Sequence, residues 1–437
     1  MVLRNAFARM LMLALTATLA ACVETPPIPD MRGAFTMSGD TSVTVPFTFD
    51  DNRVFVEMVV TRADGSMRNV LAFVNMGSGS FVLSNALYRE LGIGDGRKLR
   101  ISLGAMHIAV DPKVVQPEDQ ANAFDLALNP FHHSPSAAEM AKGPGGSLLA
   151  MTAPMKVEAE IPSGLLQNFR TAFDYGARTL TLSAPDNSRP QGIAVPLRVN
   201  PRTGFATIDL SVDGKSYPLV IDNGGNYSAI SHSVVSDWLG THKNWLRSEG
   251  GVGESNLTMD GQFDVGAPVV KAQNAQIGSL KLAEFGAVSP AGSGMMGGLI
   301  ARAFYGFYSD KAGESVDGWI GGNVLKSFRV TLDYKNGMSY WQQIAPLDTN
   351  DLDQVGITLV HWGKITGIAG IAKKNGADTV TGTQPGDLIV SIDGRPTTEM
   401  TRGALLAALH GKPGDYRKLV LVRAGKQLTV DVPVTGF

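Results

Sequence analysis

Two segments in the middle of the chain share an unusual ending. Residues 161–175 read IPSGLLQNFRTAFDY and residues 320–334 read IGGNVLKSFRVTLDY. Both fit the pattern I-x-x-x-x-L-x-x-F-R-x-x-Φ-D-Y, where Φ is apolar, at an offset of 159 residues. A repeat of this length indicates a duplicated domain rather than a solenoid. The sequence therefore predicts two similarly folded lobes, one after the other.

The beginnings of the two copies match as well. Residues 54–84 and 205–231 each run through an alternating strand, an Asp-Gly turn, a second strand and a Gly-rich loop. Asp-Gly between alternating apolar runs is a strong hairpin signal. A short helical stretch follows each loop, NALYRELG in the first copy and HSVVSDWLG in the second. The offset is 147 here, so the second copy holds about a dozen extra residues between the two landmarks.

This combination of hairpin, D-[TS]-G-type turn and late D-Y segment resembles the retropepsin-like aspartic proteases. The resemblance covers residues 43–185 and 192–345 and is stronger in the second copy. It implies a mainly β fold with two tandem acid-protease β-barrel lobes, the first of them degenerate. Bacterial members of that group often carry a PDZ domain downstream.

The aspartic protease chemistry needs one carboxylate from each lobe. Two close carboxylates share one proton, and the pair activates a water and polarises the scissile carbonyl. Asp222, in IDNGG, is the candidate in the second copy, but the matching position of the first copy is Asn75, in VNMGSGS. An amide neither takes nor gives up that proton. The expected active-site loops comprise, besides this pair, Met76, Gly77, Ser78, Asn223, Gly224 and Gly225.

The residue after the catalytic Asp in the family is usually Thr, and here it is Met76 in one copy and Asn223 in the other. Both departures favour a protease-like scaffold with a broken dyad. Three alternatives stay open. Two chains could bring their Asp222 residues together, or an Asp–Asn site could keep weak activity, since losing one acid–base partner typically costs ~10²–10⁴-fold. A slipped alignment could also offer Asp51 or Glu57, although neither lies in the correct turn.

The pattern changes after residue 353. Residues 354–434 contain QPGDLIVSIDGRP, a helix TRGALLAALHG and two final strands, and resemble an α+β PDZ domain. Such domains bind an extended peptide by adding it as a strand. The resemblance points to a peptide-binding segment of Gly356, Ile357, Thr358 and Leu359. The alternative is a structural cap that packs on the protease-like body and binds nothing.

The N-terminus is typical of a targeting segment. Residues 1–22 carry Arg4 and Arg9 before an apolar run too short to span a bilayer, and end in LAAC. Cys22 is the only cysteine, and the segment resembles a bacterial lipoprotein signal in which that cysteine is lipidated. Val23 then favours the outer membrane, with residues 23–42 as a tether. An ordinary signal peptide is the alternative.

Composition and the remaining motifs exclude several classes. A net charge of −2 gives no basic footprint for nucleic acid. The Gly-rich 292–297 segment lacks a preceding strand, and His132–His133 lacks metal-ligand spacing, so neither a cofactor nor a metal is expected. There is no G-x-S-x-G elbow for a serine nucleophile. We therefore expect a lipid-anchored protein of the periplasmic envelope that binds a peptide or an envelope protein through its cleft and PDZ domain. The alternatives are an active aspartic endopeptidase using Asp222 and a purely structural accessory lipoprotein.

Overall fold

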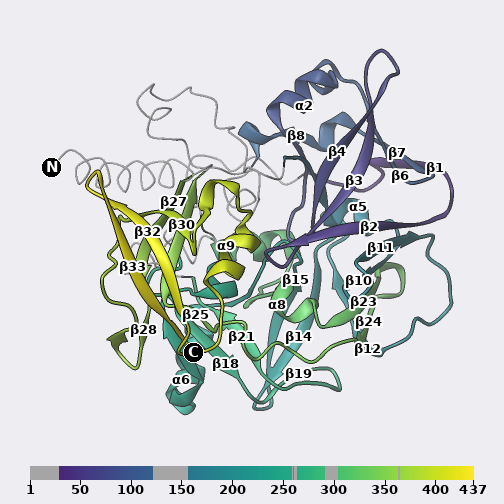
Figure 1. The fold of residues 1–437 in the computed structure, drawn as a ribbon. Helices are drawn as coiled ribbons and strands as arrows, with labels where there is room; N and C mark the ends of the chain where they lie inside the picture. Colours follow the sequence, from purple (N-terminus) through teal and green to yellow (C-terminus); the bar gives the residue numbers. More distant parts are fainter. Residues whose placement is uncertain (1–28, 122–155, 258, 260–262, 291–303, 363–364) are drawn as a thin grey trace.

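The computed structural model describes residues 29–121, 156–257, 259, 263–290, 304–362 and 365–437 (Figure 1). The described residues are mainly β, with three sheets and short helices. We call residues 29–183 the first half, 192–345 the second half and 354–437 the C-terminal unit. Among the described residues, no helix has the length and apolar character needed to cross a membrane.

The first half contains eleven strands and two short α-helices among its described residues. In chain order these are β1 (Phe35–Gly39), β2 (Ser42–Asp50), β3 (Arg53–Thr61), β4 (Met67–Asn75), β5 (Phe81–Leu83), α2 (Asn85–Glu90), β6 (Leu99–Leu103), β7 (Met106–Val110), β8 (Val115–Pro117), β9 (Val157–Pro162), α5 (Ser163–Leu166), β10 (Arg170–Asp174) and β11 (Thr179–Ser183).

The second half follows the same plan. Its described elements are β12 (Ile193–Pro196), β13 (Arg198–Val199), β14 (Ala206–Val212), β15 (Lys215–Ile221), β16 (Ser228–Ile230), α6 (His232–Thr241), β17 (Leu246–Glu249), the 3₁₀ turn η5 (Gly253–Ser255), β18 (Pro268–Ala272), β19 (Ala275–Ile277), β20 (Leu280–Leu282), β21 (Phe285–Val288), β22 (Gly318–Ile320), α8 (Gly322–Leu325), β23 (Phe328–Asp333) and β24 (Met338–Gln343). Residues 304–312 are also helical.

The C-terminal unit, in green to yellow in Figure 1, has a sheet of its own beside one α-helix. Its elements are β25 (Gln354–Val355), β26 (Ile357–Trp362), β27 (Ile365–Ile371), β28 (Lys373–Lys374), β29 (Ala377–Asp378), β30 (Leu388–Ile392), β31 (Arg395–Pro396), α9 (Arg402–Leu409), β32 (Tyr416–Arg423) and β33 (Lys426–Thr435). The two-residue strand β28 pairs with β29 and, at Lys373, with Glu249 of β17, so one backbone pairing joins this unit to the second half.

The sequence repeat is also a repeat of strand pairing. In the first half β4 pairs parallel with β9, which pairs antiparallel with β5. In the second half β15 pairs parallel with β22, which pairs antiparallel with β16. A fourth strand extends this set in each half: β8 pairs parallel with β5, and β21 pairs parallel with β16. The two Gly-rich loops thus leave equivalent strands, β4 and β15.

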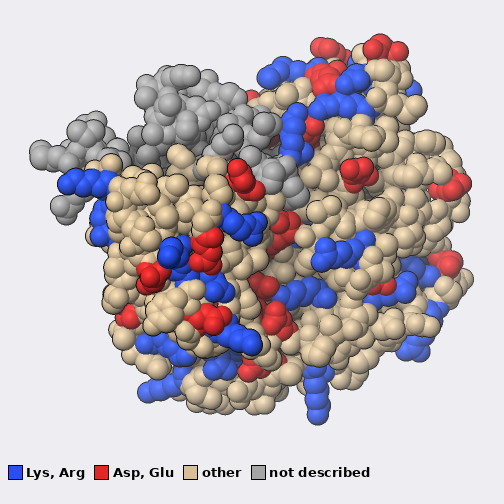
Figure 2. Space-filling model, viewed as in Figure 1, with Lys and Arg blue, Asp and Glu red and all other residues tan. Residues whose placement is uncertain are grey.

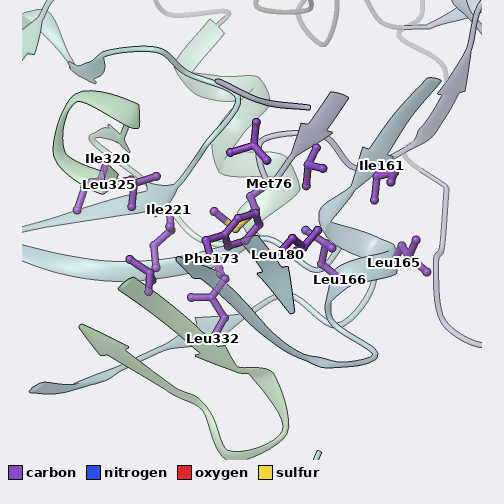
Figure 3. Packing of buried hydrophobic residues seen from close by; sticks show 14 of the residues in the cluster. Met76, Ile161, Leu165, Leu166, Phe173, Leu180, Ile221, Ile320, Leu325 and Leu332 are labelled. Carbon is purple, nitrogen blue, oxygen red and sulfur yellow. The ribbon is translucent and has the colours of Figure 1, made fainter. Parts of the chain in front are cut away.

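The two halves meet through an antiparallel pair of strands, β10 and β23. Arg170 lies opposite Asp333 and Asp174 lies opposite Arg329, so the pair is centred on Ala172. This pairing merges strands of both halves into one sheet. Beneath it, one buried apolar cluster combines residues of both halves, as Figure 3 shows for Met76, Ile161, Leu165, Leu166, Phe173, Leu180, Ile221, Ile320, Leu325 and Leu332. The halves therefore share a core as well as a sheet.

The second half contains a hairpin that the described part of the first half lacks. By their pairing, β6 and β7 correspond to β19 and β20, because β6 pairs with β3 and β19 pairs with the equivalent strand β14. Strands β17 and β18, which pair with each other and are joined by residues 250–267, have no counterpart among the described strands of the first half. We call residues 250–267 the long loop; its residues 258 and 260–262 are outside the described part of the chain.

Candidate functional site

The two Gly-rich loops hold Asn75 and Asp222 in the same way. Asn75 ends β4, and Asp222 directly follows β15. Asn75 Oδ1 accepts a hydrogen bond from Gly77 N at 2.8 Å, and Asp222 Oδ1 accepts one from Gly224 N at 2.8 Å. Each side chain thus closes the same turn two residues along its own loop. The two residues occupy equivalent positions in the two halves.

The loops also touch each other. A Cβ on Gly77 would lie 2.2 Å from Asp222 Oδ2, and a Cβ on Gly224 would lie 2.0 Å from Asn75 Oδ1. Both glycines are therefore required by close approach rather than by backbone angle. Asn223 Oδ1 accepts a hydrogen bond from Met76 N at 2.8 Å, which ties one loop to the other. An amide thus makes a cross-loop bond at a position that is usually Thr in the family resembled.

Asn75 forms a hydrogen bond with a buried acid on the neighbouring strand. Asn75 Nδ2 donates to Glu160 Oε1 at 2.8 Å, and both residues are buried. Glu160 lies on β9, and the residue at the offset of 159 in the second half is Trp319. An amide at 75 supplies a donor to the carboxyl at 160, whereas a carboxylate at 75 would not. The first half is thus adapted to Asn at this position.

Asp222 has a different neighbour. It is fully buried, and Tyr308 Oη, from the 304–312 helix, donates to Asp222 Oδ2 at 2.8 Å. The Tyr308 ring stacks on Trp319 with their centroids 5.0 Å apart. Burial raises the pKa of Asp222 above its ordinary value, and the hydrogen bonds from Tyr308 and the backbone of Gly224 oppose that rise. One oxygen of this carboxyl is therefore held by a phenol and the other by its own loop.

A buried ion pair from the first half supports the Asp222 loop. Arg53 pairs with Asp51 in the turn between β2 and β3, and both side chains are almost fully buried. Arg53 Nε donates to Gly224 O at 2.9 Å, and Arg53 Nη2 donates to Leu257 O at 3.2 Å. Asn226 Nδ2 donates to Asp51 Oδ1 at 2.9 Å. Asp51 is thus a structural partner of the loop and does not face Asp222 as a second acid.

The other predicted loop residues have structural contacts. Ser78 O accepts a hydrogen bond from Ser163 Oγ at 2.7 Å. A Cβ on Gly225 would lie 2.4 Å from Trp319 Nε1, so that glycine leaves room for the indole. Glu57 is exposed on β3, away from the buried loops.

The four residues that the PDZ resemblance singles out lie at the start of β26. Gly356, Ile357, Thr358 and Leu359 are all buried. Strand β26 is an edge of its sheet, yet each of its residues 357–361 is buried. The helix α9 beside it is held by the first half, because Asp50 accepts hydrogen bonds from Thr401 Oγ1 and from Gly403 N. The C-terminal unit therefore packs on the first half through α9.

Three contacts of this site carry little or no signal in the sequence. Tyr308, Glu160 and Arg53 each reach their partners across at least 85 residues of chain. Of the three, only Glu160 leaves a sequence signal, since it is an acid in the apolar strand VEAEIP opposite Trp319 of the repeat. Cys22, His132–His133 and the 292–297 segment lie outside the described residues.

Electrostatics and metal-ligand clusters give no further site on the parts described. On the face shown in Figure 2, basic and acidic side chains are interspersed. Among the described residues, no group of three or more His, Cys, Asp or Glu side chains is placed to hold a metal ion. The candidate site thus has a buried carboxyl bonded to a phenol in the second half, and an amide bonded to a second buried carboxyl in the first half.

Comparison with known proteins adds little. No protein-family model matches the chain, and no curated protein matches it. One similar solved structure is a photosystem II D1 C-terminal processing protease, with a TM-score of 0.17 and 20% identity over 20% of this chain and 23% of that one. Another is conglutin gamma, a basic 7S globulin from lupine seeds, with a TM-score of 0.36 and 9% identity over 70% of this chain and 96% of that one. The chain matches under a quarter of that protease's length, and both scores are too low to carry an argument. The structure itself establishes a mainly β protein.

Proposed function

We propose that this chain is a degenerate aspartic protease of the retropepsin-like, two-lobed kind, with a C-terminal PDZ-like unit. It binds an extended peptide or a protein partner and does not cut it. The observation that carries this proposal is that Asn75 and Asp222 close equivalent turns in the two touching loops. A shared-proton dyad needs two carboxyls at these positions, and the pair here has one.

Two further contacts support an inactive site. Glu160 accepts from the amide of Asn75, so replacing that amide alone would put two buried carboxyls together. Tyr308 donates to Asp222 Oδ2, which leaves this oxygen already bonded within the protein. The site therefore departs from a catalytic dyad in the surroundings of both loop positions, as well as in the residue at position 75.

The proposed place of action is the envelope. The lipobox-like end of residues 1–22 supports lipidation at Cys22 and anchoring to a membrane, the outer one favoured by Val23. Several acyl chains on one residue anchor stably where a single chain does not. The test is metabolic labelling with a radioactive fatty acid, which would enter the wild-type protein but not a Cys22→Ser variant.

Catalysis is tested on protein lacking residues 1–22. Wild type and Asp222→Ala are incubated with a diverse peptide mixture from pH 3 to 8 and analysed by mass spectrometry. We expect intact peptides from both proteins at every pH. Cleavage by wild type that vanishes in Asp222→Ala would overturn the proposal and establish an aspartic endopeptidase.

Binding is tested with the same mixture on immobilised protein. We expect a reproducible subset of peptides to be retained, equally by wild type and Asp222→Ala, because the buried carboxyl is not the recognition group. Folding of both proteins is checked by circular dichroism. Neither cleavage nor retention by folded protein would favour a structural accessory role.

A further inference from the structure

The outer edge of β26, away from β27, already makes hydrogen bonds within the chain. Asn256 of the long loop accepts from Leu359 N through Oδ1 and donates through Nδ2 to Leu359 O at 3.4 Å. Two residues along the strand, His361 N donates to Met259 O at 2.7 Å. Alternate residues of an edge strand present their backbone groups to an incoming strand. The long loop therefore meets β26 at the positions that an added peptide strand would use.

We call the described residues Asn256, Leu257 and Met259 the segment, and its two apolar side chains lie in two different cores. Leu257 belongs to a buried cluster of the second half, whereas Met259 is fully buried in the apolar cluster of the C-terminal unit. That cluster also contains Leu359 of β26 and Leu405 and Leu406 of α9. The η5 turn just before the segment packs against α9. The segment thus lies between the strand and the helix, with one thioether side chain in their shared core.

The segment is held in a conformation that needs support. Met259 has φ of 43°, in the left-handed region that non-glycine residues rarely adopt. Such a residue costs on the order of 1 kcal/mol and persists only where its surroundings fix it. The β17–β18 hairpin that carries the long loop has no counterpart among the described strands of the first half, so the shared fold does not require this loop.

We propose that Asn256, Leu257 and Met259 of the long loop are an internal ligand of the groove between β26 and α9. The groove takes an external extended peptide with a Met-like aliphatic side chain when Met259 leaves it. This inference rests on the proposed peptide-binding role of the C-terminal unit. It adds a ligand class, and it makes the long loop the competitor that an external peptide must displace.

The loop and the Asp222 site are linked by one side chain. Arg53 donates to Gly224 O, two residues beyond Asp222, and to Leu257 O, two residues before Met259. Displacement of the segment would therefore remove one of the bonds of the guanidinium that supports the Asp222 loop.

Fluorescence anisotropy tests the competition. The probe is a labelled, C-terminally amidated peptide Ser-Asn-Leu-Thr-Met, the sequence of residues 255–259, used up to about millimolar protein because a tethered loop has a millimolar effective concentration. The proteins are wild type, Met259→Asp and the control Met67→Asp, which puts the same charge at an exposed methionine of β4. We expect Met259→Asp to bind at least ten-fold tighter than wild type, and Met67→Asp to match wild type.

A second, less disruptive variant controls for misfolding of Met259→Asp. Met259→Gly removes the side chain and suits the positive φ, and we expect it to bind at least three-fold tighter than wild type. Hydrogen exchange of a peptic fragment covering residues 357–362 should be faster in this variant, because His361 N loses a stable acceptor. Unchanged exchange in Met259→Gly would overturn the internal ligand.

The possible failures are distinct. Equal affinities of wild type, Met259→Asp and Met259→Gly, all folded, would overturn the competition and leave peptide binding standing. No binding to any variant, with faster exchange in Met259→Gly, would instead overturn the peptide-binding role of the C-terminal unit and this inference with it.

Discussion

The two halves repeat one strand order but surround their central loop residues differently. In the first half Asn75 bonds to the buried Glu160, and in the second half Asp222 bonds to Tyr308. The turns themselves are closed by the same 2.8 Å bond to a glycine N–H. Duplication has thus kept the backbone, while each polar side chain has been fitted to its own buried neighbour. Restoring a dyad would require changing those neighbours too.

The largest loss of stability should come from replacing Arg53, which supports the Asp222 loop and has no equivalent in the other half. The residue at the offset of 147 from Arg53 is Asn200, which bonds to Lys311 O instead. Arg53→Ala leaves Asp51 buried without its cation, so we expect the free energy of unfolding to fall by about 3–5 kcal/mol. Urea unfolding at pH 7 measures it.

Arg62→Ala is the matched control for Arg53→Ala. Its ion pair with Glu90 is partly exposed, so we expect a loss of at most about 1 kcal/mol. Equal losses for the two arginine variants would show that the buried pair does not support the loop.

An intermediate loss of stability should follow from placing Asp at the central position of both loops. Asn75→Asp removes the donor to Glu160 and adds a second buried carboxyl, so we expect a loss of about 1–3 kcal/mol at pH 7. Two such carboxyls share one proton in the folded state, so the loss should shrink towards pH 4. Urea unfolding at both pH values measures this.

The double variant Asn75→Asp/Glu160→Gln sharpens that test. The amide at 160 would donate to the new carboxylate, which reverses the original hydrogen bond. We expect most of the lost stability to return. A double variant no more stable than Asn75→Asp would mean that Glu160 does not determine the choice of Asn.

The smallest effect should come from the opposite exchange, Asp222→Asn. Burial holds the pKa of Asp222 above its unfolded value, so its protonated form is favoured in the fold. The stabilisation from this protonated form is complete below the pKa that Asp222 has in the unfolded chain. It is lost as the pH rises through the pKa that Asp222 has in the folded protein. The variant should match wild type in stability near pH 3 and be more stable than wild type at pH 7. A variant less stable than wild type at pH 7 would contradict this.

Much of the fold could be predicted because it rests on local patterns. The helical stretches expected after each loop and in the C-terminal unit are α2, α6 and α9. The offset of 147 in the sequence matches Asn75 to Asp222, and the same turn at both positions agrees with that alignment.

The rest depends on contacts that carry no local signal. Tyr308 reaches Asp222 from a helix 86 residues away, and Met259 lies in a loop whose sequence has no periodic pattern. The PDZ resemblance singled out residues 356–359 as a peptide-binding segment, but it did not indicate that the edge of β26 is occupied from within. Burial of an edge strand is decided by another part of the chain, which pattern alone does not identify.

The strands that join the halves carry one charge pattern twice. Each has an Arg followed four residues later by an Asp, and both cross-strand pairs form, at 2.8 Å for Arg170–Asp333 and 3.9 Å for Arg329–Asp174. A strand with this pattern is complementary to a second copy of itself in antiparallel register. The junction therefore has the chemistry of a symmetric homodimer interface, and the linker between the halves sets a high local concentration of one edge near the other. Two chains could satisfy the same contacts by exchanging halves, so domain-swapped dimers are the expected by-product of refolding at high concentration.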